Sequence, residues 1–438
     1  MLYPESLIKR DFENKRKANK KRIEKSMSEW KEYKLGDLYD VHNGLSKGRK
    51  FFGSGYPFLS FKTVFNNYFL PPKLSELVQA NEKEQKGYNI KRGDVFVTRT
   101  SETPEELGMS SVALKDYPFA TYNGFTKRLR PKDMSLVCPE FIGYYLRSPK
   151  FRALFYGLAS SMSTRASLVN GDLLGMSVFL PSFETQERIA SLLSSLDDKI
   201  SVNKKICENL EAQAQALFKH WFIDFAPFKD GKFVESELGM IPEGWRVGKA
   251  EDFYSINIGK TPPRAQQQWF SESKNNNKIW ISISDMGNCG AFISDSKEYL
   301  TPEAQNKFNI IMVPIGTILL SFKLTIGRVA IANEELTTNE AIARFILPST
   351  EYREFTYLYL KQYKYGRLGS TSSIATAVNS KIIKSMLLLM PTTDVIKGFS
   401  SITSKLFDEI KTLTQESSRL STLRDTLLPR LMSGEIKL

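Results

Sequence analysis

Two segments of the chain repeat apolar residues with the spacing of paired helices. From Ile189, alternating steps of four and three residues land mainly on apolar side chains as far as Leu217. Residues 192–218 contain neither Pro nor Gly. The steps average 3.5 residues, which is the repeat of a coiled-coil seam. A second seam with the same phase begins 210 residues later, at Phe399, and reaches Leu427.

Each segment alone is explained by an amphipathic helix packed on a domain. Two seams in the same phase favour helices that pair with each other. Asn203 occupies one seam position, where a buried polar side chain often sets the register at some cost in stability. The large apolar seam residues are Leu193, Leu196, Ile200 and Leu210 in the first segment and Leu406, Ile410, Leu413 and Leu420 in the second.

The rest of the chain repeats as well, with a period of about 215 residues. "WKEYKLGDLYDVHNGLSKGR" from Trp30 resembles "WRVGKAEDFYSINIGKTPPR" from Trp245. This offset matches Tyr39 with Tyr254, Gly44 with Gly259 and Arg49 with Arg264, and a slightly longer one matches Gly93 with Gly316. The order is therefore globular module, long helix, globular module, long helix.

Each module combines strand-like and helix-like segments. "GDVFVTRT" and "IWISISDM" are rich in β-branched and aromatic residues and predict strands, whereas "PEFIGYYLRSPKFRALFYGL" predicts a helix. Tandem modules are usually related by an approximate two-fold axis. The expected fold is α/β (α+β), with two pseudo-symmetric globular domains joined by two long antiparallel coiled-coil helices.

Composition shifts and helix signals divide the chain into six parts. Their limits are 1–26 for a basic N-terminal extension, 27–182 for the first domain, 183–226 for the central helix, 227–244 for a linker, 245–391 for the second domain and 392–438 for the C-terminal helix and tail.

The charge of the chain favours a polyanionic partner. The formal net charge is +13, and nucleic acid is the usual partner of such a protein. Residues 1–26 hold nine basic and four acidic side chains, so the larger part of the excess lies outside this extension. The extension is either a solvated tail or a phosphate contact. Three scattered cysteines, the lack of a signal peptide and the lack of a membrane-spanning apolar run predict a cytoplasmic protein.

No strong catalytic motif is present in the sequence. Two histidines, His42 and His220, exclude a multi-histidine metal site and disfavour a Ser-His-Asp centre. "FFGSG" at Phe51 to Gly55 fits a methyl-donor motif of amino-methyltransferases. Those enzymes also need an Asn or Asp before two prolines and an aromatic residue after them, and neither "LPPKL" nor "TPPRA" supplies this. A methyltransferase stays as an alternative interpretation.

Longer stretches carry a resemblance to a known family. "PSFETQERIASLLSSLDDKI" begins the central helix, "QAQALFKHWFIDFAPF" and "ELGMIPEGWRV" follow it, and "LRDTLLPRLMSGEI" ends the second helix. In these stretches the chain resembles the specificity subunit of type I restriction–modification systems over nearly its whole length. The resemblance implies two target-recognition domains, each reading one half of a split double-stranded DNA sequence, with the helices setting the gap.

The resemblance also implies partners and cofactors. Two modification subunits, which are adenine N6-methyltransferases that use S-adenosylmethionine, would dock on this chain. Restriction subunits that translocate DNA with ATP and Mg would complete the nuclease. The chain itself would be non-catalytic, without a cofactor or metal of its own. A coiled-coil adaptor without DNA readout is a further alternative.

Base edges are read by polar side chains, and phosphates are contacted by cations and hydroxyls. We therefore expect DNA contacts from basic and hydroxyl-rich loops of both modules. The three glutamines of the second module have no match in the first and suit adenine. The expected residues are Ser46, Lys47, Arg49, Lys50, Thr98, Arg99, Thr100, Ser163, Thr164 and Arg165 in the first module, and Lys260, Thr261, Arg264, Gln266, Gln267, Gln268, Lys323, Arg328, Thr371 and Ser372 in the second.

Overall fold

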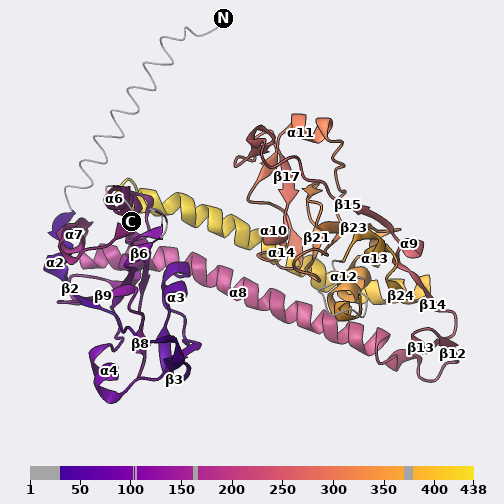
Figure 1. The fold of residues 1–438 in the computed structure, drawn as a ribbon, viewed down its shortest axis with the longest axis horizontal. Coiled ribbons are helices and arrows are strands. Elements are labelled where there is room, and N and C mark those ends of the chain that lie inside the picture. Colours follow the sequence, from indigo (N-terminus) through magenta and orange to yellow (C-terminus); the bar gives the residue numbers. More distant parts are fainter. Residues whose placement is uncertain (1–29, 102, 104–105, 161–165, 369–377) are drawn as a thin grey trace, which may run out of the picture. The chain divides into compact units, whose positions relative to one another are not determined.

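The computed structural model describes residues 30–101, 103, 106–160, 166–368 and 378–438 (Figure 1). The chain divides into two compact units. The first unit is built from the residues up to Lys199 together with Arg419–Leu438, and the second is Ile200–Ser418. The division cuts both long helices, so each unit contains a part of each helix. No helix in the described part of the chain is long and apolar enough to cross a bilayer.

The two predicted long helices are present. Helix α8 spans Phe183–Phe222 and helix α14 spans Thr393–Met432, with 40 residues each, or roughly 60 Å. At the start of α8, the hydroxyl of Ser182 accepts the Thr185 amide at 3.3 Å, which satisfies one of the free N–H groups of the first turn.

The helices pair in antiparallel fashion within each unit. In the second unit the Asn203 amide donates to the Glu416 carboxylate at 2.7 Å, and the Cys207 thiol lies 3.7 Å from the Ile410 carbonyl. Residue numbers therefore rise along α8 as they fall along α14. In the first unit the Arg424 guanidinium on α14 pairs with Asp197 on α8 at 2.5 Å.

The seam residues are buried to different degrees. Leu193, Ile410 and Leu413 are buried, and Leu196, Ile200, Leu210, Leu406 and Leu420 are half-buried. Leu193 belongs to the core of the first unit, where it lies with Leu428, Leu431 and Met432 of α14. That core therefore contains side chains from both ends of the described chain. Asn203 is fully buried at its seam position.

The first unit is a mixed α/β module in which the first and last strands pair, β1 with β11. Its main sheet has the order β2-β9-β5-β7, and a smaller sheet has the order β4-β3-β8. The elements before α8 are β1 (Lys31–Lys34), α2 (Leu35–Leu38), β2 (Tyr39–Asn43), η1 (Arg49–Phe51), β3 (Phe52–Leu59), α3 (Phe61–Asn66), β4 (Glu76–Val78), α4 (Glu82–Gly87), β5 (Val95–Thr98), β6 (Thr100–Ser101), β7 (Ser110–Val112), β8 (Thr121–Tyr122), β9 (Thr126–Pro131), α5 (Pro139–Tyr145), α6 (Pro149–Ser160), β10 (Ala166–Ser167), α7 (Asn170–Gly175) and β11 (Ser177–Leu180).

The second unit repeats this plan, and here β14 pairs with β24. Its sheets have the orders β15-β23-β20-β21-β18 and β16-β19-β17-β22. The elements between α8 and α14 are η3 (Ala226–Phe228), β12 (Phe233–Ser236), β13 (Gly239–Pro242), β14 (Arg246–Lys249), α9 (Ala250–Phe253), β15 (Ser255–Ile258), η4 (Gln267–Trp269), β16 (Phe270–Ser271), β17 (Lys278–Ile281), α10 (Ile283–Met286), β18 (Phe292–Ile293), β19 (Tyr299–Leu300), α11 (Pro302–Lys307), β20 (Ile318–Ser321), β21 (Val329–Ala332), β22 (Thr337–Thr338), β23 (Ile342–Ile346), η5 (Thr350–Tyr352), α12 (Arg353–Gln362), η6 (Tyr365–Arg367), α13 (Ser380–Lys384) and β24 (Leu387–Met390).

Glycines matched in the sequence occupy equivalent positions. A Cβ on Gly44 would lie 2.0 Å from the Asn123 carbonyl oxygen, and one on Gly259 would lie 2.1 Å from that of Asn339. Both glycines therefore let the chain after β2 or β15 cross closely over the turn that leads into β9 or β23. The predicted fold class, two repeated modules with two long helices, is confirmed.

Aromatic residues at the end of α8 belong to the core of the second unit. Phe218 and Phe222 are buried there, with Trp221 and Phe225 packed against them. These side chains therefore pack on the globular part of the second unit. The segment 227–244, expected as a linker, forms η3 and the β12–β13 hairpin.

Candidate nucleic-acid interface

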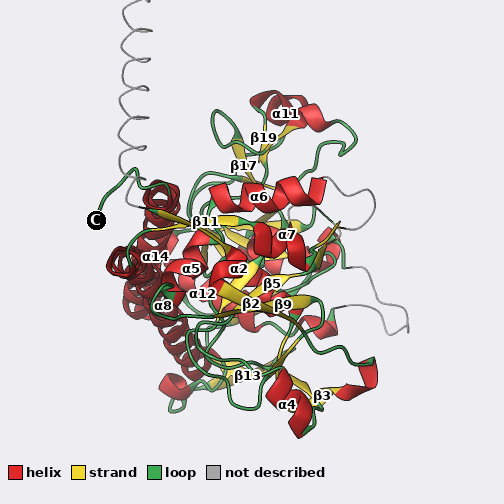
Figure 2. Cartoon of the chain, turned by 90° about the vertical axis from the view of Figure 1, so that its left-hand side faces the viewer, coloured by secondary structure: helices red, strands yellow, loops and turns green. Residues whose placement is uncertain are grey.

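Three loops meet at one end of the main sheet in the first unit. Strand β9 is antiparallel to both β2 and β5, with Asn43 beside Lys127 and Thr98 beside Thr126. The chain therefore leaves β2 and β5, and enters β9, at the same end of the sheet (Figure 2). Pairing of β6 with β10 adds a fourth segment there. We call residues 44–51, 99–101, 123–125 and 166–167 the first loop end.

The second unit has an equivalent arrangement. Ile258 at the end of β15 lies beside Ala343, and Ser321 at the end of β20 lies beside Ile342, both near the start of β23. The loops after β15 and β20 and the turn before β23 therefore gather at one end of the five-stranded sheet. We call residues 259–269, 322–328 and 339–341 the second loop end. Both loop ends contain residues expected to contact DNA.

The basic loop 46–50 of the first unit contains exposed cations and one cation that is bound to other protein groups. Ser46, Arg49 and Lys50 are exposed. The Lys47 ammonium is held more firmly, because it pairs with Glu84 at 2.7 Å and donates to the Gln79 carbonyl at 2.5 Å. A phosphate at this loop would meet Arg49 and Lys50 without displacing a protein carboxylate recorded in the structure.

Thr98 differs from the other expected contact residues because it is fully buried. Its hydroxyl donates to the Glu106 carbonyl at 2.8 Å and accepts the Met109 amide at 2.9 Å. The side chain therefore holds the loop after β5 together and is not placed to reach a base. Arg99 and Thr100 follow it and are partly exposed.

Lys127 on β9 lies beside the first loop end, a position that the sequence pattern did not reveal. It is buried, and its ammonium donates to the side-chain oxygens of Asn43, at 3.4 Å, and Asn170. Burial, and then the neighbouring charge of Arg99, lower the pKa of Lys127. The available signal was the run Thr126 to Arg130, in which three cations share a strand otherwise suited to a core.

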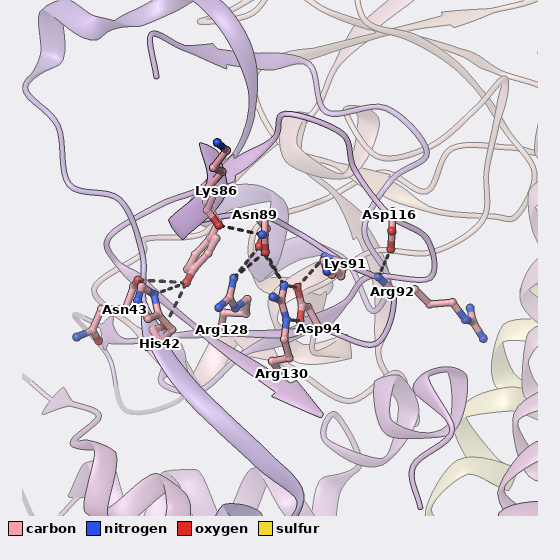
Figure 3. A network of polar contacts seen from close by, with 11 residues as sticks. His42, Asn43, Lys86, Asn89, Lys91, Arg92, Asp94, Asp116, Arg128 and Arg130 are labelled. Atoms are coloured by element: carbon pink, nitrogen blue, oxygen red, sulfur yellow. Dashed lines mark hydrogen bonds and ion pairs between the residues drawn. The ribbon is translucent and has the colours of Figure 1, made fainter. Parts of the chain in front are cut away.

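The other two cations of β9 fix the segment after α4 (Figure 3). The Arg130 guanidinium forms an ion pair with buried Asp94 at 2.6 Å and donates to the Asn89 side chain at 2.8 Å. Arg128 donates to the Asn89 carbonyl at 2.7 Å, and burial lowers its pKa. The equivalent Arg344 of β23 donates to the Ile311 and Ile258 carbonyls, and burial lowers its pKa too. These arginines are structural, since Arg128 and Arg344 donate to backbone carbonyls and Arg130 donates mainly to the side chains of Asp94 and Asn89.

Several expected residues of the second unit already contact protein groups. Arg264 forms an ion pair with Glu298 at 2.6 Å, and its guanidinium lies 4.6 Å from the Trp280 ring centre. Arg49, matched to Arg264 in the repeat, is exposed within η1. The two arginines therefore stand in different environments. The Thr261 hydroxyl donates to the Glu340 carboxylate.

The three glutamines of this loop also differ among themselves. Gln266 accepts the Trp269 indole N–H at 2.7 Å, and the amide of Gln267 donates to the Arg264 carbonyl at 3.0 Å. All three are exposed, but the Gln268 side chain has no hydrogen bond to another residue in the described part of the chain, so its amide is the one best placed for a base edge.

Basic side chains at the other edges of the second loop end are held to different degrees. The Lys260 ammonium lies 3.3 Å from the carbonyl oxygens of Phe308 and Asn309. Lys323 is exposed, whereas the Arg328 guanidinium donates to the Ile283 carbonyl at 2.6 Å. Five expected residues and the basic extension 1–26 lie outside the described residues. They are Ser163, Thr164, Arg165, Thr371 and Ser372.

The methyl-donor motif "FFGSG" belongs to an irregular strand. Phe52 and Tyr56 both face Val78, so residues 53–55 form a bulge in the pairing of β3 with β4. Gly53 and Gly55 have φ values of +96° and +102°, which only glycine adopts readily. The strand geometry thus accounts for both glycines. In the described ranges, no three His, Cys, Asp or Glu residues are grouped as metal ligands.

Comparison with known proteins identifies the family. The family model for the type I restriction modification DNA specificity domain matches residues 27–212 and 242–420. The chain belongs to this specificity family. The specificity subunit of the type I restriction enzyme HindI from Haemophilus influenzae is 27% identical, over 94% of this chain and all of its own length. The MjaIX specificity subunit from Methanocaldococcus jannaschii is 28% identical, over 95% of both chains.

A solved structure supports the same fold. The crystal structure of the type I restriction–modification S subunit from M. genitalium aligns with a TM-score of 0.51 and 15% identity, covering 92% of this chain and 96% of that one. Members of the specificity family bind DNA and act as targeting subunits within restriction–modification complexes. The chain is therefore a non-catalytic specificity subunit, and the methyltransferase alternative is set aside.

Proposed function

We propose that the chain reads a bipartite target on double-stranded DNA, with one half read at each loop end. The observation that carries this proposal is the repeat of one sheet plan with different side chains at its end. The glycine crossings at Gly44 and Gly259 are common to both units. Lys127, by contrast, is replaced by Ala343 at the equivalent point of β23. A shared frame with different loops suits two different half-sites.

In this proposal, partner subunits carry out the methylation and the cleavage of DNA. Two modification subunits would methylate adenine at N6 with S-adenosylmethionine, and restriction subunits would translocate and cut DNA with ATP and Mg. The specificity chain would hold none of these cofactors. Family membership supports this division of work. Because the proposed target is cellular DNA, we propose a cytoplasmic location for the complex.

The experiment is to map N6-methyladenine in host DNA with the gene intact, deleted and altered. The altered gene carries a relative's second domain in place of residues 245–391. We expect a split motif that vanishes on deletion, and the exchange should change one half of it and leave the other half intact. A motif that persists without the gene would refute the proposed targeting, and a change in both halves would refute independent reading.

We further propose that the paired helices set the gap between the half-sites. One turn of helix adds about 5.4 Å, and successive base pairs lie about 3.4 Å apart. Four residues inserted after Ile200 should lengthen the methylated gap by roughly one or two base pairs and keep both half-sites. Two inserted residues should rotate the seam by about 200° and abolish modification. An unchanged gap with four added residues would assign the spacing to the partner subunits.

A further inference from the structure

One apolar side chain at the second loop end is completely exposed. Leu324 lies in the loop 322–328 between β20 and β21. Its backbone φ is +60°, in the left-handed region that residues other than Gly, Asn and Asp seldom adopt. The position therefore combines an unfavourable backbone conformation with an unfavourable exposure of an apolar group.

The loop that carries Leu324 is held by several hydrogen bonds. The Ser321 hydroxyl donates to the Thr325 carbonyl at 2.6 Å, and it accepts the Arg328 amide at 3.1 Å. The Gly327 amide donates to the Ser321 carbonyl at 3.1 Å. The Arg328 side chain fastens the loop base to the Ile283 carbonyl. Leu324 is thus presented on a braced turn.

Folding of the second unit gives no reason for a leucine at this position. Glycine or asparagine would adopt the same backbone with less strain, and any polar residue would be better solvated. Ile326, two residues further on, is also exposed, at 37%. An apolar side chain fixed outside the protein in this way is explained by an apolar surface that it meets in a complex.

The surroundings point to DNA as the source of that surface. The loop 322–328 contains Lys323 and Arg328 and no carboxylate, and it belongs to the same sheet end as Lys260 and Gln268. On the edges of base pairs in the major groove, the 5-methyl group of thymine is the apolar feature, and the other groups are hydrogen-bond donors and acceptors.

We propose that Leu324 contacts the 5-methyl group of a thymine in the half-site read by the second unit, and so helps to specify that base. This inference rests on the proposed function, since it needs a half-site at this loop end. The first unit has its own exposed apolar residue in a different loop. Phe125 precedes β9 and is 62% exposed, whereas the equivalent Ala341 is buried. The two loop ends therefore offer apolar contacts at different places, as two different half-sites require.

The test removes the methyl group from the DNA and the side chain from the protein separately. The full-length chain, with the subunits that co-purify with it, is first used to select its target from random duplexes. Each thymine of the target is then replaced in turn by deoxyuridine, which lacks only the 5-methyl group. We expect one replacement in the second half-site to weaken binding about three- to four-fold, as the loss of one buried methyl group predicts. The Leu324→Ala protein should bind the thymine duplex and this deoxyuridine duplex equally.

A matched control is available at the opposite end of the same strand. Ile315 precedes β20 and is 58% exposed, away from the second loop end. Ile315→Ala should keep the response of the unsubstituted protein to deoxyuridine. This control separates the loss of one contact from a general effect of removing an exposed apolar side chain.

Three results would overturn the inference. Deoxyuridine could weaken binding by the same factor with and without the Leu324 side chain. Leu324→Ala could weaken binding to all duplexes alike. If it also reduced the fluorescence increase of 2-aminopurine placed in the duplex, which reports unstacked bases, Leu324 would be a wedge between base pairs. The substitution could instead release a co-purified subunit, which would make it a protein contact. Equal binding of selected and random duplexes by the unsubstituted protein would refute the proposed function itself.

Discussion

Replacing Phe222 by alanine should lower the free energy of unfolding of the second unit by several kcal/mol, roughly as for other buried aromatic residues. Phe222 is 4% exposed at the end of α8. Its ring centre lies 4.8 Å from Phe399, 5.0 Å from Phe355, 5.1 Å from Phe218 and 5.8 Å from Trp245. These neighbours come from α8, α12, α14 and the segment before β14, so the ring joins four parts of the unit.

The size of the effect follows from this packing. A buried Phe→Ala change costs about 3–5 kcal/mol, because burial is lost and a cavity stays behind. Three of the four neighbours are fixed on helices and cannot move in to fill the space, so we expect ~4 kcal/mol, in the middle of that range. Domains have about 5–15 kcal/mol of total stability, so a loss of this size would remove between a quarter and most of the stability of the second unit.

Tryptophan fluorescence during urea unfolding measures this change selectively. With a urea slope of ~2 kcal/mol per molar, the midpoint should fall by about 2 M. The signal is informative because four of the five tryptophans belong to the second unit. They are Trp221, Trp245, Trp269 and Trp280, while Trp30 belongs to the first unit.

Ile223 provides the control for this experiment. It is the next residue in the chain, but it is 53% exposed. Ile223→Ala should change the free energy of unfolding by no more than about 0.5 kcal/mol. If Phe222→Ala shifts the fluorescence midpoint by less than about 0.5 M, or no more than Ile223→Ala, the aromatic cluster does not hold the second unit together.

Three further substitutions test other features. Gly259→Ala places a Cβ 2.1 Å from the Asn339 carbonyl oxygen, so it should cost about 1–3 kcal/mol and abolish binding to the second half-site alone, as measured with duplexes that each carry one half-site. Asn203→Leu removes a buried side-chain oxygen that has no hydrogen-bond partner within the described part of the chain. The substitution should raise the free energy of unfolding in urea by about 1–2 kcal/mol. A decrease would show that the hydrogen bond from Asn203 to Glu416 contributes more than the unpaired oxygen costs. Burial raises the pKa of Glu354 above its ordinary 4.5, so the ionised form destabilises the fold. Glu354→Gln should therefore raise the free energy of unfolding in urea at pH 8, and this gain should shrink as the pH falls towards 4.5. A gain that does not depend on pH would refute this reasoning.

The helices and the repeat were predictable because their signals are long or fixed by backbone geometry. A seam of alternating steps extends over many turns, so a few polar positions such as Asn203 do not obscure it. Gly44 and Gly259 are required by close crossings of the backbone, and such positions tolerate no side chain. Shorter signals were less reliable. "IWISISDM" ends as a strand at Ile281, because Ser282 and Asp285 cap helix α10.

The loop residues could be placed only by the structure. Thr98 and Arg99 are adjacent, yet Thr98 is buried and Arg99 is partly exposed. All residues of β5 are buried, so the alternation that would separate an inner from an outer face is absent. Lys127 and Arg128 suggest a solvent-exposed strand by composition, but their charges are satisfied by amide and carbonyl oxygens far away in the sequence. Such long-range partners leave no local pattern.

The first unit draws part of its core from Arg419–Leu438, which is synthesised only after the whole second unit. On a ribosome that adds 5–20 residues per second, the intervening stretch of roughly 220 residues takes about 10–45 s. During that time Ile200–Ser418 is being made, and the surface that Leu428, Leu431 and Met432 will cover is without its partners. A nascent chain that stalls before residue 419 would expose this apolar surface to chaperones and proteases. The second unit can therefore mature first, and the domain translated first is completed last.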